Sequence, residues 1–72
     1  MARFQVTVGL DWEYDLDRAL ADVGAHSVKA EQRTIKGTEY VVIADFLSPY
    51  TEKELAVDLA WLMEVAPEVV EV

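Results

Sequence analysis

The segment Thr38-Glu39-Tyr40-Val41-Val42-Ile43-Ala44-Asp45-Phe46-Leu47 decides the fold of this chain. Its centre, Tyr40 to Ala44, is apolar at every position, whereas a strand with one face in water alternates between apolar and polar residues. A strand that is apolar on both faces usually lies inside a sheet. We therefore expect residues 38–47 to form a central strand.

Three other segments are expected to supply the remaining strands. Residues 3–10 alternate, and Gly9 near their end permits a bend or a close approach of the backbone. Residues 26–35 alternate as well, and Lys36-Gly37 forms the turn to the central strand because glycine accepts positive φ. Residues 69–72 can form a last short strand.

Two segments have the period of amphipathic helices. In residues 15–23 the apolar side chains recur at i, i+3, i+4 and i+7, with Asp15 as the expected N-cap and Gly24 as the expected stop. The second helix, residues 52–65, begins at the capping box Thr51-Glu52-Lys53-Glu54. Its expected core stripe consists of Leu55, Leu59, Leu62 and Ala66.

The resulting order of elements is β-α-β-β-α-β within one domain, residues 1–72. We expect an α+β fold of the ferredoxin-like type, with a four-stranded antiparallel sheet in the order 4-1-3-2 and both helices on one face. This order places residues 38–47 in the interior, as their apolar sequence requires.

The composition excludes several classes of function. The 72 residues include 14 acidic and six basic side chains, a formal net charge of −8, and no cysteine. A disulfide, a thiolate metal site and a cysteine nucleophile are therefore absent. The charge opposes direct binding to nucleic acid and to anionic membranes, and no apolar run reaches 18 residues. We expect a soluble cytoplasmic protein.

No motif indicates an enzyme. The sequence contains no glycine-rich phosphate loop, no nucleophile elbow and no ligand triplet at metal spacing. His26 has no serine, cysteine or second histidine spaced to form a catalytic group with it. We expect no catalytic residue, no resident metal and no cofactor.

The acidic run Asp11-Trp12-Glu13-Tyr14-Asp15-Leu16-Asp17 has two interpretations. Acids at the start of a helix interact favourably with its dipole and free N–H groups. Alternating acids could also bind a divalent cation weakly, but Leu16 and Asp22 replace the glycine and the glutamate that an EF-hand loop needs.

Two surfaces are candidates for a protein partner. Val57, Trp61 and Val65 lie off the expected core stripe of the second helix, which indicates a contact surface unless Trp61 packs flat on the protein or against a loop.

The open face of the sheet is the second candidate. If Val41 and Ile43 face the helices, the open face carries Tyr40, Val42, Ala44 and Phe46. In the opposite assignment it carries Val41, Ile43 and Leu47. Either arrangement favours a homodimer or a protein partner, and the edge strand 26–35 could also pair with its copy.

The segment Val6-Thr7-Val8-Gly9-Leu10-Asp11, the helix leading to Gly24, and the closing run Pro67 to Val72 together resemble an ACT domain. The chain is also similar to the soluble C-terminal domain of MgtC-type proteins. The ACT resemblance implies a small effector, such as an amino acid, bound at a subunit interface by the loop after the first strand. It assigns ligand binding to Gly9, Asp11, Glu13 and Tyr14, where Glu13-Tyr14 replaces the usual Pro-Gly.

Two functions are therefore expected. The first is a non-enzymatic, ACT-like interaction or regulatory module that self-associates, with or without a small effector. The alternative is an accessory or anti-host protein of phage origin that binds and inhibits a cellular protein, with its acidic surface as a mimic of DNA.

Overall fold

The computed structural model describes residues 2–23, 28–46 and 50–72. Within them lie four strands, β1 (Ala2–Gly9), β2 (Val28–Lys36), β3 (Glu39–Phe46) and β4 (Glu68–Glu71). A 3-10 turn, η1 (Leu10–Trp12), joins β1 to helix α1 (Glu13–Asp22), and helix α2 (Glu52–Met63) precedes β4. The order β-α-β-β-α-β agrees with the expectation from the sequence.

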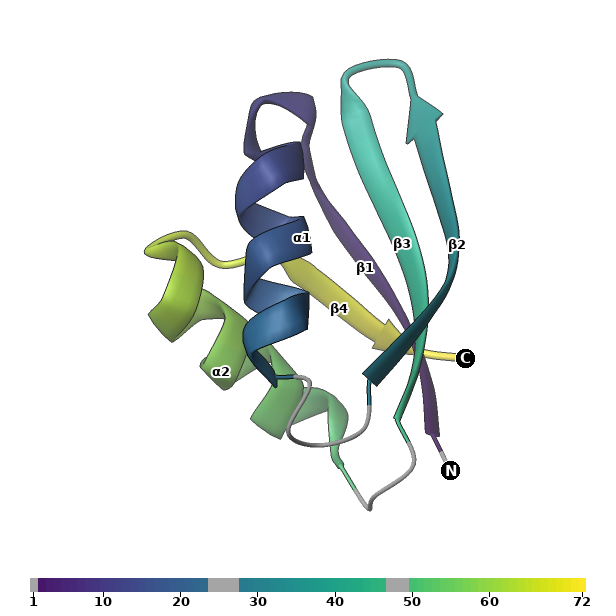
Figure 1. The fold of residues 1–72 in the computed structure, drawn as a ribbon, viewed down its shortest axis with the longest axis vertical. Helices are drawn as coiled ribbons and strands as arrows, with labels where there is room; N and C mark the ends of the chain where they lie inside the picture. Colours follow the sequence, from purple (N-terminus) through teal and green to yellow (C-terminus); the bar gives the residue numbers. More distant parts are fainter. Residues whose placement is uncertain (1, 24–27, 47–49) are drawn as a thin grey trace.

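The four strands form one antiparallel sheet in the order β2-β3-β1-β4, which reads 4-1-3-2 from the other edge. The hairpin between β2 and β3 turns at Gly37, whose φ is +63°. Both helices cover the same face of the sheet, and the opposite face has no covering layer among the described residues (Figure 1). The described residues therefore form an α+β fold of two layers.

The core lies between the helices and one face of the two central strands. Phe4 of β1 and Phe46 of β3 are both fully buried, and their rings meet edge to face with centroids 5.5 Å apart. The helices contribute the buried side chains Leu16, Ala19, Leu20, Leu55, Leu59 and Met63. Apolar burial of this kind is the main stabilising contribution in a chain without disulfides.

The structure decides which face of β3 is buried. Register pairs Val6 of β1 with Val42 of β3, so the even-numbered positions of both strands share one face. Tyr40, Val42 and Phe46 are at most 3% exposed beneath the helices, which corrects their assignment to a partner surface. Val41 and Ile43 lie on the open face, and Leu47 lies outside the described residues.

Helix α1 begins two residues earlier than expected. The chain leaves β1 directly into η1, and Trp12 stands at the N-cap position without a side-chain hydrogen bond. Asp15 is consequently not the N-cap but lies in the first turn, where an acidic side chain is favoured by the helix dipole. Gly24, the expected stop, lies outside the described residues.

Helix α2 has the expected start and a different core face. The Thr51 hydroxyl accepts the Glu54 backbone N–H at 3.1 Å, and the Thr51 N–H donates to the Glu54 carboxylate at 3.1 Å, which confirms the capping box. The buried residues are Leu55, Leu59 and Met63, whereas Leu62 is 42% exposed. Ala66 is exposed and lies beyond the helix, which ends when Glu64 adopts a left-handed φ of 62°.

Candidate functional site

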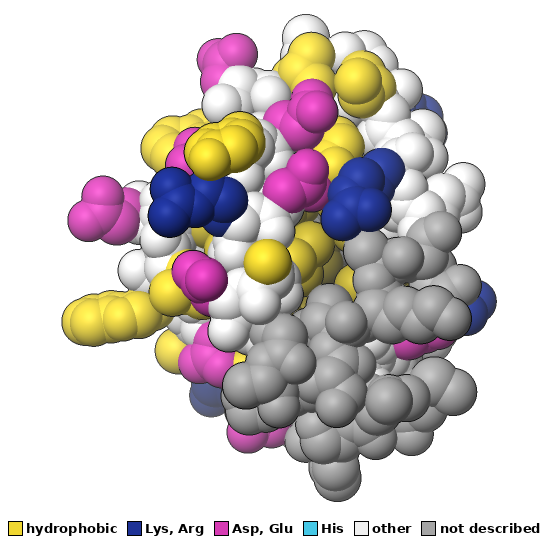
Figure 2. Space-filling view, viewed as in Figure 1, with side chains coloured by type: hydrophobic (Ala, Val, Ile, Leu, Met, Phe, Trp, Pro, Cys, Tyr) yellow, Lys and Arg dark blue, Asp and Glu magenta, His cyan; other side chains and the backbone are white. Residues whose placement is uncertain are grey.

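Charge is divided unequally between the two layers of the protein. The segments that form the helices and their caps, residues 10–23 and 51–64, hold nine of the 14 acidic residues and two of the six basic ones. They therefore carry seven of the eight excess negative charges. Acidic side chains are spread over the helical side in Figure 2. A surface of one sign attracts partners of the other sign and repels its own copy.

Helix α2 presents large apolar side chains to solvent within this acidic layer. Trp61 is 84% exposed and Val57, one turn before it on the same side, is 59% exposed. Both side chains are therefore accessible to a partner, as the expected contact surface requires. Val65 differs, because it is half-buried against the core.

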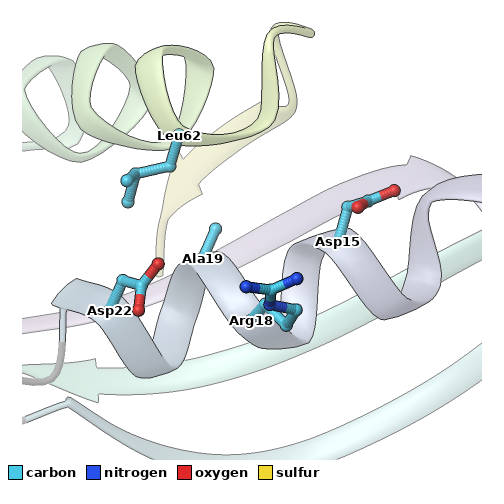
Figure 3. A pocket seen from close by; sticks show the side chains of 5 residues that line it. All are labelled: Asp15, Arg18, Ala19, Asp22 and Leu62. Carbon is cyan, nitrogen blue, oxygen red and sulfur yellow. The ribbon is translucent and has the colours of Figure 1, made fainter.

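A shallow hollow of about 150 Å³ lies between the two helices (Figure 3). Leu62 of α2 reaches toward Ala19 of α1, while Asp15 and Asp22 lie on either side of Ala19 along α1. Arg18 also lines the hollow, with its guanidinium carbon 5.8 Å from the centre of the Tyr14 ring. The hollow thus joins a small apolar floor to carboxylates and one guanidinium.

The open face of the sheet has a different character. A hollow of about 260 Å³ on this face is lined by Gln5, Gln32, Thr34, Lys36, Val41 and Ile43. Val70 of β4 pairs with Gln5 and is 43% exposed. The chain outside the helical segments carries an excess of only one negative charge, so this face opposes another copy much less than the helical layer does.

The two edges of the sheet differ in their backbone hydrogen bonding. At the β4 edge, the Glu71 N–H donates to the carboxylate of Glu52 at 2.8 Å, so a side chain of α2 occupies that donor. Strand β2, nine residues long, forms the other edge, with a bulge between Ala30 and Gln32. A long edge strand is the usual place for another chain to pair.

The expected ligand-binding residues are only partly brought together. Gly9 and Asp11 line a hollow of about 300 Å³ with Leu10, Trp12 and Thr38, where the Leu10 N–H donates to the Thr38 carbonyl at 2.8 Å. Glu13 and Tyr14 belong to the first turn of α1 and do not line it.

The backbone at Gly9 does not require glycine. Its φ of −62° and ψ of 150° are open to any residue, and an added Cβ would meet Trp12 Cδ1 at an ordinary 3.8 Å. The bend or close backbone approach that glycine would permit here is therefore not what this position depends on.

The acidic run does not converge on a common point. Among the described residues no three histidine, cysteine, aspartate or glutamate side chains form a group suited to a metal ion. Asp15 faces the hollow between the helices, whereas Asp17 accepts hydrogen bonds from Tyr40 and Arg33 of the sheet. The interpretation of a weak cation site thus gains no support from the geometry. His26 lies outside the described residues.

Three carboxylates join separate parts of the fold through contacts that the sequence did not indicate. Asp17 accepts the Tyr40 hydroxyl at 2.8 Å and Arg33 Nε at 3.2 Å, and burial followed by this hydrogen bond raises the pKa of Tyr40 from 10.0 to about 12. Asp45 accepts both Nε and a terminal nitrogen of Arg3, at 2.7 and 3.1 Å. Asp58 accepts the Tyr50 hydroxyl, and burial is the main cause of the raised pKa of Tyr50.

These pairs join residues from eight to 42 positions apart, so only strand register and helix placement reveal them. They stabilise the fold and leave the exposed surfaces as the candidates for function. No helix in the described part of the chain is long and apolar enough to cross a membrane. Comparison with known protein families, curated proteins and solved structures finds no match to this chain.

Proposed function

We propose that this chain is a small, non-enzymatic binding module of the ferredoxin-like, ACT-like type that acts as a homodimer formed through its sheet. The observation that carries the proposal is the division of charge between the layers, since the chain outside the helical segments has an excess of only one negative charge. Val41, Ile43 and Val70 supply apolar contact there. Strand β2 supplies an edge for pairing.

The test is the mass in solution across a concentration series, measured by light scattering on a sizing column. We expect a dimer at low micromolar concentration. Ile43→Lys should shift the protein to monomer, because it places a charge in the middle of the proposed interface. Val57→Lys, an equal change on the exposed side of α2, is the matched control and should leave the dimer intact. A wild-type monomer throughout the series contradicts the proposal.

A small effector forms a second part of this proposal, at the hollow lined by Gly9 and Asp11. A ligand that binds only the folded protein raises its melting temperature by linkage. We expect at least one member of a panel of amino acids and nucleotides to do so, and Asp11→Asn to reduce the shift. A panel without any shift removes the effector while leaving the dimer to be judged by mass.

A second candidate function is inhibition of a cellular protein through the helical layer, as in an accessory protein of phage origin. The same division of charge favours it, because an acidic layer can occupy a basic cleft in the manner of DNA. We expect the protein to displace a labelled duplex from a DNA-binding protein with such a cleft. Failure to displace DNA from any of several such proteins contradicts this function.

A further inference from the structure

The acidic layer contains a feature that a mimic of DNA does not need. Electrostatic competition for a basic cleft requires charges alone, yet Trp61 and Val57 stand 84% and 59% exposed on α2, and Leu62 is 42% exposed. Val57 lines a hollow on this helix with two carboxylates, Glu54 and Asp58, and one base, Lys53. We call Val57, Trp61 and Leu62, together with the acidic residues Asp15, Asp22 and Glu64, the Trp61 face.

We propose that the Trp61 face binds a basic segment of another protein that also carries an apolar side chain. This inference rests on the second proposed function and names the chemistry of its partner. Lys or Arg side chains of the segment pair with the carboxylates, and its apolar side chain covers Trp61.

The apolar part of the Trp61 face is suited to anchoring. Trp61 and Val57 are four residues apart on α2, so their side chains are neighbours on one side of the helix. Tryptophan is enriched among the residues that dominate the affinity of an interface. Its ring also attracts a cation placed over it, so a lysine or arginine stem gains contact with Trp61 as well as with the acids.

The charged part of the Trp61 face selects the occupant. A second copy would bring two layers together that each hold an excess of seven negative charges, and nucleic acid or an anionic membrane would be repelled in the same way. The carboxylates of Asp15 and Asp22 have no hydrogen bond or ion pair within the described residues, so both can pair with an incoming cation. Arg18 is the one base among the described residues that line the hollow, and its guanidinium lies over the Tyr14 ring.

The probe is a short amphipathic helical peptide made of Lys and Leu, labelled for anisotropy and added to the full chain. Two further peptides serve as comparisons, a Glu and Leu peptide of the same pattern and an oligolysine of the same charge. We expect the Lys and Leu peptide to bind well, oligolysine to bind at least about tenfold more weakly, and the Glu and Leu peptide not to bind.

Trp61→Ala tests the anchor. We expect it to weaken binding of the Lys and Leu peptide roughly tenfold or more, as for an anchoring tryptophan. Trp12→Ala is the matched control, because Trp12 is 38% exposed and lines the hollow that contains Gly9 and Asp11. This substitution should leave binding of the Lys and Leu peptide unchanged. Circular dichroism checks that each variant is folded.

A pair of charge variants tests where on the protein the Lys and Leu peptide binds. Asp15→Asn, Asp22→Asn and Glu64→Gln together neutralise the Trp61 face and should weaken binding about fivefold. Glu39→Gln, Glu68→Gln and Glu71→Gln remove the same charge from the sheet layer and should weaken it less than about twofold, because charges beyond a Debye length are screened.

Three results overturn the inference: no binding of the Lys and Leu peptide, equal binding of oligolysine, or equal effects of the two charge variants. Displacement of DNA that does not depend on Trp61 would preserve the second proposed function while rejecting this inference. The homodimer is judged separately, by the mass of the protein alone.

Discussion

At the scale of single residues, Asp17 holds the first helix to the sheet. Its carboxylate accepts the hydroxyl of Tyr40 from β3 and the guanidinium of Arg33 from β2, so one side chain of α1 contacts two strands. The Tyr40 residue is 3% exposed, so its hydroxyl depends on a protein partner. Arg33 is about half exposed, so its ion pair with Asp17 contributes less to stability than the hydrogen bond from Tyr40 does.

We expect Asp17→Ala to lower the free energy of unfolding by about 1–3 kcal/mol, because it leaves the Tyr40 hydroxyl without an acceptor. Asp15→Ala, which removes a carboxylate two residues earlier in the same helix, should change it by less than about 0.5 kcal/mol. Urea denaturation measures both. Equal losses in the two variants would contradict the role assigned to Asp17.

The hydrogen bond between Tyr40 and Asp17 also makes the free energy of unfolding depend on pH in the alkaline range. Burial and the hydrogen bond to Asp17 raise the pKa of Tyr40 from 10.0 to about 12, so the folded protein retains this proton more strongly than the unfolded chain. The stabilisation is complete below pH 10 and is lost as the pH rises through about 12. We expect the melting temperature of Tyr40→Phe to fall less steeply across this range. Identical slopes for wild type and variant would reject the assignment.

At the scale of elements, α2 divides its apolar residues between the core and the surface. Leu55, Leu59 and Met63 follow one another every four residues and lie beneath the helix. Leu62, one position before Met63, faces the hollow toward α1 and keeps 42% of its surface exposed. Two adjacent residues of similar size therefore have different roles.

We expect Met63→Ala to cost about 2–4 kcal/mol, since it removes a buried side chain and leaves a cavity. Leu62→Ala is its neighbour and matched control, and should cost about 1 kcal/mol or less because water already reaches the site. Chemical denaturation of both variants decides the matter. A larger loss of free energy of unfolding for Leu62→Ala than for Met63→Ala would instead support the core stripe expected from the sequence.

The end of α2 offers a stabilising substitution. Glu64 has a φ of 62°, a left-handed conformation in which a Cβ is unfavourable. Glu64→Gly should raise the free energy of unfolding by about 1 kcal/mol. Glu64→Ala keeps the Cβ and removes the charge, so the difference between the two variants isolates the backbone contribution. A glycine variant no more stable than the alanine variant would contradict this reasoning.

At the scale of the whole molecule, the division of charge between the layers has an energetic cost. Carboxylates gathered on α1 and α2 repel one another, and salt reduces this repulsion because the Debye length is about 10 Å at 0.1 M. We expect sodium chloride to raise the melting temperature by a few degrees, for a gain of about 1 kcal/mol or less.

The two charge variants show where the repulsion resides. The rise with salt should be smaller after Asp15→Asn, Asp22→Asn and Glu64→Gln than after Glu39→Gln, Glu68→Gln and Glu71→Gln, although the net charge is the same. Differential scanning fluorimetry at several salt concentrations compares them. Equal salt responses would indicate that the total charge matters and its placement does not.

Local patterns in the sequence were sufficient for the order of the elements, the hairpin turn at Gly37, the interior position of the strand Glu39–Phe46 and the capping box at Thr51. Each depends on neighbours a few residues apart, through side-chain period, positive φ or a short hydrogen bond. The exposure of Trp61 and Val57 could also be predicted, because they lie off the apolar stripe of α2. The ends of the helices were predicted less well. Helix α1 begins at Glu13, two residues before the expected start, and α2 ends at Met63, two residues before the expected end.

Only the tertiary structure decided which face of β3 is buried, and with it the exclusion of Tyr40, Val42 and Phe46 from any partner surface. Both faces of that strand are apolar, so the choice came from its register with β1 and from the helices above it. The hydrogen bonds at Asp17, Asp45 and Asp58 and the division of charge between the layers arose in the same way. Each depends on residues that are distant in the chain, and patterns among neighbouring residues do not predict such contacts.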